Sequence, residues 1–217
     1  MSKLQELATA VANGKSKLVP GLVQECLDEG VAPIDILNKG MIDAMGEVGE
    51  KFKRNEIFVP EMLVAARAMK KGVETLKPHL GGENSGKIGK MVMGTVYGDL
   101  HDIGKNLVVM MIESTGYEVV DLGIDVPVQK FVEAAEDPEV SVVGVSALLT
   151  TTMPAMREIV AALNKSPRRK DFKIMVGGAP ISQEFCDEIG ADIYTTDAAS
   201  ASQAAKALAM ERMARED

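Results

Sequence analysis

The stretch Met91-Val92-Met93-Gly94-Thr95-Val96 is followed at once by the polar loop Tyr97-Gly98-Asp99-Leu100-His101-Asp102 and by a second apolar segment that begins at Ile103. The first run is short, apolar and closed by turn residues, which predicts a buried strand. The second segment keeps helical spacing up to Ser114, which predicts a helix. A strand joined to a helix by a short loop is the repeating unit of α/β folds, so this stretch indicates that class.

The same alternation continues to the end of the chain. Further strands are predicted over Glu118–Leu122, Val140–Ser146, Phe172–Val176 and Asp192–Tyr194. Further helices are predicted over Pro127–Ala135, Thr152–Leu163, Ser182–Ile189 and about Ala198–Met213. Five such units in series predict a Rossmann-like (flavodoxin-like) parallel sheet with helices on both faces, in the common strand order 2-1-3-4-5.

The first 80 or so residues have a different pattern: their apolar residues recur only at helical spacing, and strand signals are absent. Pro33 can open a helix, and Pro60 suits the first turn of another. We therefore predict a cap of four or five short helices over residues 1–84. The α/β domain then covers residues 85–217, and the polar, turn-rich stretch Gly81–Gly86 is the predicted linker.

Composition and charge exclude several classes of protein. Apolar residues make up 46% and charged residues 26% of the 217, the balance of a globular protein rather than a disordered one. The formal net charge of -8 argues against nonspecific binding to nucleic acid or to an anionic membrane. Cys26 and Cys186 form no disulfide framework or metal-site spacing, and no apolar run is typical of a signal peptide or membrane span. We expect a reduced, cytoplasmic protein with no nucleic-acid or membrane partner.

Ligands of open parallel sheets bind beyond the carboxyl ends of the strands, near the point where the strand order reverses. The loops predicted at that edge are Gly98–Asn106, Ser146–Thr150, Gly177–Pro180 and Thr195–Ala198. In the order 2-1-3-4-5, the first and third strands are neighbours at the switch point. His101 and Ser146 are therefore expected beside the same crevice.

His101 has the features of a metal ligand with one supporting carboxylate. Asp99, two residues before it, can accept a hydrogen bond from one imidazole nitrogen and leave the other free for a metal. One histidine without a cysteine pair cannot supply a zinc or iron site, but a single ligand suits a metal held in a macrocycle. Gly104 and the pair Gly177-Gly178 can open a slot for a bulky ligand.

These motifs resemble a known family. Asp99-x-His101-x-x-Gly104, followed by Ser146-x-Leu148 and Gly177-Gly178, resembles the fingerprint of cobalamin-binding domains in methionine synthase, carbon-skeleton mutases and corrinoid proteins of methyltransferase systems. The stretch Asp121–Pro127 looks like the family's second strand and the loop after it. Met45–Phe52 and Ile57–Glu61 resemble the methyl-cap helices of methionine synthase, which the mutases lack. The chain is thus similar to a free-standing corrinoid protein of a methyltransferase system.

The resemblance implies cobalamin as cofactor, in the base-off form, with His101 as the lower axial ligand of cobalt. It implies a hydrogen-bond relay of His101, Asp99 and Ser146 as the catalytic group. The implied cofactor contacts are Gly98, Asp99, Leu100, His101, Asp102, Ile103, Gly104, Ser146, Leu148, Thr150, Gly177, Gly178, Tyr194, Thr196, Asp197 and Ala198. The displaced nucleotide tail would fill the slot, the helical cap would cover the methyl face, and Gly81–Lys87 would be the hinge.

The resemblance also implies a function as a methyl carrier that is not catalytic alone. Cobalt(I) would accept a methyl group from a substrate:corrinoid methyltransferase, and methyl-cobalt(III) would pass it to a pterin or thiol methyltransferase. A reductive activation protein would be a third partner. The sequence does not distinguish methanol, methylated amines, betaines, methoxylated aromatics or methyl thiols as the donor.

Alternatives stay open on the sequence alone. One is a cobalamin-sensing regulator, although no basic recognition helix is present. Another is a flavodoxin-like module without corrin, which leaves His101 and Gly177-Gly178 unexplained. Single residues also have structural explanations: Asp102 is well placed to cap a helix, Ser146 to end a strand, and Gly177-Gly178 to form a tight turn. Lys105 and Asn106 could either open a helix or touch a phosphate or corrin amide.

Overall fold

The structure is a computed structural model that describes residues 2–79 and 87–216. It divides into two compact units. One comprises the residues up to Lys87 together with Glu113–Gly116, and the other comprises Ile88–Ile112 and the residues from Tyr117 onward. The predicted boundary after residue 84, the linker Gly81–Gly86 and all of the predicted hinge except Lys87 lie outside the described residues.

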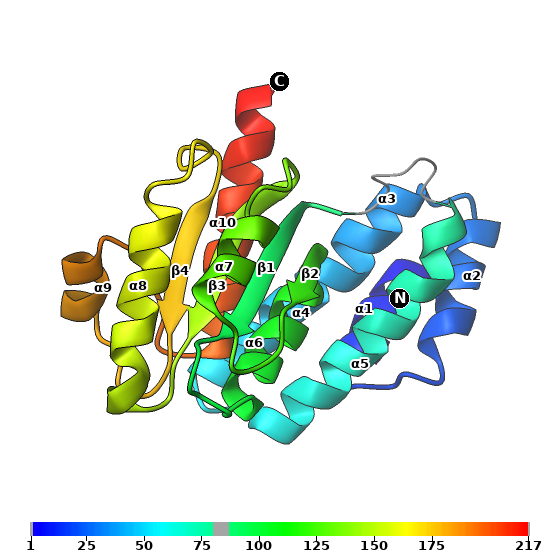
Figure 1. Cartoon of the computed structure of the whole chain (residues 1–217). Coiled ribbons are helices and arrows are strands. Elements are labelled where there is room, and N and C mark those ends of the chain that lie inside the picture. The colour runs from blue at the N-terminus through cyan, green and yellow to red at the C-terminus, as the bar shows by residue number, and fades with distance from the viewer. Residues whose placement is uncertain (1, 80–86, 217) are drawn as a thin grey trace. The chain divides into compact units, whose positions relative to one another are not determined.

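The first unit is helical, as the sequence predicted. Its elements are α1 (Lys3–Ala12), α2 (Val19–Asp28), α3 (Pro33–Asp35), the π-helix η1 (Ile36–Ile42), α4 (Asp43–Lys53), α5 (Val59–Leu76) and the 3-10 helix η2 (Lys77–His79) (Figure 1). Within residues 2–79 no strand is found. Pro33 and Pro60 both stand in first helical turns, where a missing backbone N–H costs nothing.

The π-helical segment was not predicted. It joins α3 to α4 without a break, so that one continuous helix runs from Pro33 to Lys53. Gly40 lies within it, and a Cβ there would come 2.9 Å from side-chain carbons of both Leu4 and Leu7. The absence of a side chain at Gly40 therefore lets α1 approach this helix closely. The methionines of the unit fill its core: Met41, Met45, Met62 and Met69 are all buried.

The second unit contains a five-stranded parallel sheet in the order β2-β1-β3-β4-β5, as predicted. Its strands are β1 (Gly89–Thr95), β2 (Tyr117–Asp121), β3 (Val140–Ser146), β4 (Lys173–Gly177) and β5 (Ile193–Tyr194). Its helices are α6 (Ile103–Glu113), α7 (Val128–Ala134), η3 (Thr150–Thr152), α8 (Met153–Leu163), α9 (Gln183–Ile189) and α10 (Ala198–Glu216). The predicted bounds are met to within one or two residues, except that α10 runs three residues further.

Helices cover both faces of the sheet (Figure 1). On one face, Phe131 of α7, Ile159 of α8 and Phe185 of α9 pack with the valines of β1 and β3. On the other face, α6 and the alanine-rich α10 cover Met91 and Met93 of β1. Side chains alternate between the faces of a strand, so both alternate sets of β1 are buried, as expected for a parallel sheet with two covered faces.

The register aligns the carboxyl ends of three strands. Thr95 at the end of β1 pairs with Ser146 at the end of β3, and Ser146 pairs in turn with Gly177 at the end of β4. The loops that follow these strands therefore leave the sheet side by side. Across residues 2–79 and 87–216, no helix has both the length and the apolarity that a membrane crossing requires.

Candidate functional site

The β1–α6 loop carries His101 and is shaped by two unusual backbone positions. Gly98 has a φ of +80°, which favours glycine, and its N–H donates to the Asp125 carboxylate at 2.7 Å. Asp125, in the β2–α7 loop, itself has a φ of +53°, and its N–H donates to the carbonyl of Asp99 at 3.0 Å. Two hydrogen bonds thus join the β2–α7 loop to the β1–α6 loop, which we call the histidine loop.

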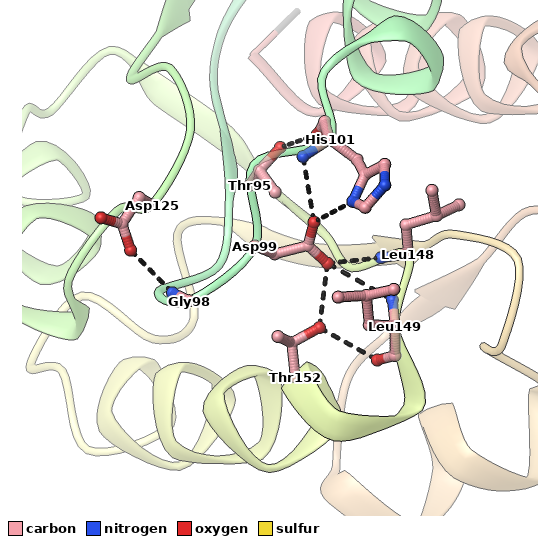
Figure 2. Close-up of polar contacts among 8 residues, drawn as sticks. All are labelled: Thr95, Gly98, Asp99, His101, Asp125, Leu148, Leu149 and Thr152. Atoms are coloured by element: carbon pink, nitrogen blue, oxygen red, sulfur yellow. Dashed lines mark hydrogen bonds and ion pairs between the residues drawn. The ribbon is translucent and has the colours of Figure 1, made fainter.

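Asp99 is the centre of the site, and its carboxylate is fully buried (Figure 2). Oδ1 accepts the N–H of His101 at 3.0 Å and lies 2.8 Å from the Nδ1 of the same residue. Oδ2 accepts the Leu148 N–H at 2.8 Å, the Leu149 N–H at 3.4 Å and the Thr152 hydroxyl at 2.9 Å. One carboxylate therefore joins the β1–α6 loop to the β3–α8 loop, which lies about fifty residues further along the chain.

The hydrogen bonds decide the charge of this carboxylate. Burial on its own raises the pKa of Asp99, but the bonds from the backbone N–H groups of Leu148 and His101, the imidazole and Thr152 outweigh it. The net result is a pKa well below the usual range of an aspartate. An ionised carboxylate only accepts hydrogen bonds, so Nδ1 of His101 must be the protonated nitrogen. In the neutral imidazole, Nε2 then keeps its lone pair and is free to ligate a metal.

His101 presents its ring to the exterior, with 51% of its side chain exposed. The Thr95 hydroxyl fixes the backbone below the ring by donating to the His101 carbonyl at 2.9 Å. Large apolar side chains are also exposed in the β1–α6, β2–α7 and β3–α8 loops and at the start of α6, and they form what we call the apolar rim. They are Tyr97, Leu100, Ile103, Ile124, Leu148 and Leu149. Such an exposed apolar rim marks a binding surface, and together with one free imidazole nitrogen it fits a large macrocycle that carries its own metal.

The two predicted glycine features differ in what they do. A Cβ on Gly104 would meet no heavy atom within 4 Å, so this position opens onto free space, as a ligand slot requires. Gly178 has a φ of +132°, and its Cβ would lie 1.8 Å from the carbonyl oxygen of Ala147. That glycine is needed because the end of β4 packs against the backbone of the β3–α8 loop. Gly177 is less constrained, since its Cβ would come no closer than 3.4 Å to the Thr195 carbonyl.

Ser146 lies at the end of β3, paired with Thr95 at the end of β1, the neighbourhood in which the sequence predicted it. Its carbonyl accepts the Val96 N–H at 3.0 Å, and within residues 2–79 and 87–216 no hydrogen bond joins its hydroxyl to Asp99. The hydroxyl that contacts Asp99 belongs to Thr152, which the sequence had shown only as the start of a helix. The signal available was a hydroxyl residue in the loop after β3, but only the fold shows which of several such residues turns toward Asp99. The catalytic role of Ser146 stays a prediction.

The β5–α10 loop contributes a carboxylate with a different task. Asp197 accepts the Ser200 N–H at 2.8 Å, the Ser200 hydroxyl at 2.9 Å and the Thr196 hydroxyl at 3.0 Å. Burial raises the pKa of Asp197, but the bonds from Ser200 and Thr196 prevail and lower it. Asp197 thus caps the first turn of α10. Contacts of Tyr194, Thr196, Asp197 and Ala198 with a cofactor stay predictions, as does that of Thr150.

Lys105 and Asn106 support the histidine loop. The buried ammonium of Lys105 lies 2.5 Å from Oδ2 of Asp121 and 2.8 Å from Oδ1 of Asn106. The amide nitrogen of Asn106 donates to the Asp102 carboxylate at 3.1 Å, and its N–H donates to the Asp102 carbonyl at 2.7 Å. These contacts fasten the start of α6 to the end of β2, so the structure favours the supporting role of Lys105 over a phosphate contact.

Comparison with known proteins agrees with this geometry. A family model described as a B12 binding domain matches residues 89–205, and a second model with the same description matches residues 3–77. The α/β unit and the helical unit are therefore both those of a B12-binding protein. Dimethylamine corrinoid protein 1 of Methanosarcina acetivorans is 44% identical over 206 residues, which cover 94% of this chain and 96% of the relative. The chain belongs to the family of B12-binding corrinoid proteins.

Two solved structures are similar to this chain over most of its length. A cobalamin-binding protein from Desulfitobacterium hafniense is similar with a TM-score of 0.79 and 33% identity, covering 94% of this chain and 98% of that one. A chain of the methanol:cobalamin methyltransferase complex from Methanosarcina barkeri is similar with a TM-score of 0.83 and 30% identity, covering 96% and 80%. The similarity thus extends through both units.

Proposed function

We propose that this protein is a corrinoid methyl carrier, which takes a methyl group from a substrate:corrinoid methyltransferase and delivers it to an acceptor methyltransferase. The observation that carries the proposal is the imidazole of His101, held at Nδ1 by a buried ionised carboxylate and exposed at the other side. When bound, the corrinoid supplies a cobalt centre that can take up and release a methyl group. The chain itself then supplies the ligand, its orientation and its surroundings.

In this proposal, His101 is the lower axial ligand through Nε2, and cobalamin is bound base-off. Asp99 supports that role in two ways. Its acceptor Oδ1, 2.8 Å from Nδ1, fixes the tautomer, and its negative charge makes the imidazole a stronger donor to a cation. The open space at Gly104, three residues after His101, would leave room for a displaced base in this proposal.

The exposed apolar rim has its own part in the proposal. Leu100 and Ile103 flank His101 along the loop, and Leu148 comes from the neighbouring strand end. Apolar side chains under a bound ring exclude water from the lower face of the metal, which strengthens the electrostatic effect of Asp99 on His101. Burial of the rim by the cofactor also supplies hydrophobic binding free energy.

We infer that the methyl donor is a methylated amine. The relatives described as dimethylamine corrinoid protein 1 of Methanosarcina acetivorans and trimethylamine corrinoid protein 1 of Methanosarcina mazei are 44% and 41% identical to this chain. The partners would be a methylamine:corrinoid methyltransferase, an acceptor methyltransferase that uses a pterin or thiol, and a reductive activation protein. Free, buried Cys26 and Cys186 are in keeping with work in the reduced cytoplasm.

Electron paramagnetic resonance can test the ligand assignment directly. Protein labelled with ¹⁵N-histidine is loaded with cobalamin and reduced to cobalt(II), and the superhyperfine splitting from the axial nitrogen is recorded. A histidine ligand changes the splitting from a triplet to a doublet on labelling, whereas the cofactor's own unlabelled base leaves a triplet. His101→Ala should abolish the labelled signal. His79→Ala is the matched control, because His79 is the other histidine and lies in η2 of the helical unit.

Methyl transfer tests the rest of the proposal. Reduced, loaded protein is incubated with dimethylamine, trimethylamine or methanol, each with its own methyltransferase, and methylation is followed by the corrin absorption bands. Methylation with an amine system supports the inferred donor. Methylation only with methanol would replace the donor and leave the carrier function, and methylation with none of the systems would count against the carrier.

A further inference from the structure

A tight turn leads from β1 into the histidine loop. The Val96 carbonyl accepts the N–H of Asp99 at 3.1 Å, so residues 96–99 form a hydrogen-bonded β-turn. Of its two central residues, Gly98 has a positive φ of +80° and Tyr97 does not, which defines a type II turn. In this turn the N–H of Gly98 is not part of the bond that closes the turn, so it needs an acceptor from elsewhere.

Asp125 of the β2–α7 loop supplies that acceptor. Its Oδ1 accepts the Gly98 N–H at 2.7 Å, and Figure 2 shows this bond reaching across from the β2–α7 loop to the turn. Turns of types I and II differ mainly in the orientation of the peptide between their two central residues, which here contains this N–H. A charged acceptor makes a stronger hydrogen bond than a neutral one. The Asp125 carboxylate therefore favours the orientation seen in the type II turn.

The backbone of Asp125 makes a second contact with the same turn. Its N–H donates to the Asp99 carbonyl at 3.0 Å, while the Asp99 carboxylate is held from the β3–α8 loop by Leu148 and Thr152. Asp99 is thus fixed at its backbone by one loop and at its side chain by another. Its Oδ1 then lies 2.8 Å from Nδ1 of His101.

The two contacts of Asp125 depend on its left-handed backbone. Its φ of +53° is unfavourable for a residue with a side chain, although aspartate tolerates this region better than most residues do. Such a conformation persists only where the surroundings determine it. The bond from Gly98 to the carboxylate offsets part of this cost, and it thereby keeps the N–H of Asp125 directed at Asp99.

Nearby bonds between the two loops do not depend on the side chain at position 125. The Thr95 N–H donates to the Gly123 carbonyl and the Val126 N–H donates to the Thr95 carbonyl, both at 3.0 Å. Asp125 itself is exposed. Substitutions of Asp125 should therefore change the turn before His101 and leave the sheet intact.

We propose that Asp125 is a positioning residue for His101, which acts by holding the turn at residues 96–99 and the backbone of Asp99. The meaning of the histidine as a metal ligand rests on the proposed function, whereas the contact between the two loops does not. A loop that already has its bound conformation loses less conformational entropy when a ligand binds. Asp125 thus prepares the histidine loop before the cofactor arrives.

Three variants separate the carboxylate from the backbone. Asp125→Gly removes the carboxylate and accepts a positive φ without strain. Asp125→Asn keeps an acceptor oxygen and also tolerates a positive φ, so it is the conservative variant. Asn55→Gly is the matched control, because Asn55 has a φ of +57° and lies in the helical unit, away from the histidine loop in sequence.

The first test uses the protein without cofactor. Assigned ¹H–¹⁵N spectra report the hydrogen bond of the Gly98 amide, and relaxation dispersion reports motion of the His101 amide. In Asp125→Gly we expect the Gly98 amide proton to move upfield and the His101 amide to show exchange broadening. In Asp125→Asn and Asn55→Gly both amides should resemble those of the unmodified protein.

The second test uses the loaded protein and the cobalt(II) splitting described above. Asp125→Gly should lower the ratio of His-bound to His-free cobalt by about threefold, less than the roughly tenfold that loss of a direct partner of the ligand costs, because Asp125 acts through Asp99. Asp125→Asn should restore most of the ratio. A purely structural role would lower the unfolding midpoint of Asp125→Gly and leave this ratio unchanged.

Gly98→Ala is the second variant if Asp125→Gly does not fold. Its Cβ would meet only the Thr152 side chain, at an ordinary 3.7 Å, so its effect comes from the unfavourable φ. It disturbs the same turn from the other partner of the bond, and it should broaden the His101 amide in the same way.

The outcomes keep the two proposals apart. A His101 amide as sharp in Asp125→Gly as in the unmodified protein would overturn the role of Asp125, and so would an unchanged cobalt ratio or an equal loss in Asn55→Gly. Absence of a histidine nitrogen on cobalt in the unmodified protein would instead overturn the proposed function. The amide spectra of the cofactor-free protein would then still decide whether Asp125 positions the histidine loop.

Discussion

Asp99 and Asp197 occupy similar positions in the sequence, each in a loop after a strand, but they have different roles in the structure. Each follows a parallel strand at the same edge of the sheet, each accepts backbone N–H and hydroxyl donors, and each has a lowered pKa. The donors to Asp197 are one and three residues away, Thr196 in the same loop and Ser200 in the first turn of α10. The donors to Asp99 include groups 49 and 53 residues away, on another loop. A local carboxylate caps a helix, whereas a carboxylate with distant donors fixes two loops and a histidine.

Asp99→Ala is expected to give the largest effect on stability. It leaves the partly buried N–H groups of Leu148 and His101 and the buried hydroxyl of Thr152 without their acceptor, and we expect a loss of about 4 kcal/mol in the unfolding free energy of the α/β unit. Urea unfolding measures the loss, and amide hydrogen exchange at Leu148 locates it. If Leu148 exchanges as slowly in the variant as in the unmodified protein, Asp99 does not hold the β3–α8 loop.

Gly178→Ala is expected to have the next largest effect, since it disturbs the other contact of the β3–α8 loop. The new Cβ would overlap the Ala147 carbonyl and adopt an unfavourable φ, which should cost about 3 kcal/mol. Gly104→Ala is the matched control, because its Cβ meets open space and should leave the unfolding midpoint almost unchanged. A side chain larger than alanine at Gly178 would clash with the backbone of the β3–α8 loop, so weaker cofactor binding by such a variant would not by itself show that a slot is blocked. Equal midpoints for the two variants would show that the close approach at Gly178 is not needed.

Asp197→Ala tests the local member of the pair and should cost about 1 kcal/mol, the usual value for loss of a helix cap. Faster amide exchange should appear at Ser200 and stay within the first turn of α10. Asp197→Asn is the control, because asparagine is also a good cap. If exchange at Leu148 also quickened, Asp197 would be coupled to the histidine loop and the contrast with Asp99 would fail.

The last expected effect is on the acid dependence of stability, where only the slope of the unfolding free energy against pH changes. The pKa of Asp99 is lowered from its ordinary value of 3.8, so folding favours the ionised form. The stability from this carboxylate is fully present above about pH 4 and is lost as the pH falls further toward the folded-state pKa. The unfolding free energy of Asp99→Ala should therefore fall less steeply below pH 4 than that of the unmodified protein. Parallel curves in urea titrations at several pH values would contradict the assignment.

Much of the site followed from short-range patterns. Asp99 and His101 are two residues apart, so their contact needs only a tight loop after a strand, and the predicted hydrogen bond is present at 2.8 Å. The strand ends were also predictable, because buried parallel strands are short apolar runs closed by turn residues. The order β2-β1-β3-β4-β5 was predicted because it is a common arrangement of five such units.

Residues that act across loops could not be identified in this way. Thr152, Asp121 and Asp125 meet the histidine loop from 16 to 53 positions away along the chain. The sequence left open whether Lys105 only opens a helix or touches a phosphate or corrin amide, and the structure shows its ammonium buried against Asp121. Ser146 was predicted as the hydroxyl beside Asp99 from its position at a strand end, whereas the hydroxyl that contacts Asp99 is that of Thr152, in the turn that follows.

By itself, the sequence determined the alternation of strands and helices, the helical first unit, and the pairing of His101 with Asp99, since all of these depend on neighbours within a few positions. Only the tertiary structure decided which hydroxyl joins that pair and why Gly178 must be a glycine. It also decided that Asp197 caps a helix, whereas Asp99 joins two loops and holds His101. The physical reason is that a carboxylate takes its role from the donors that surround it, and folding brings those donors from distant parts of the chain.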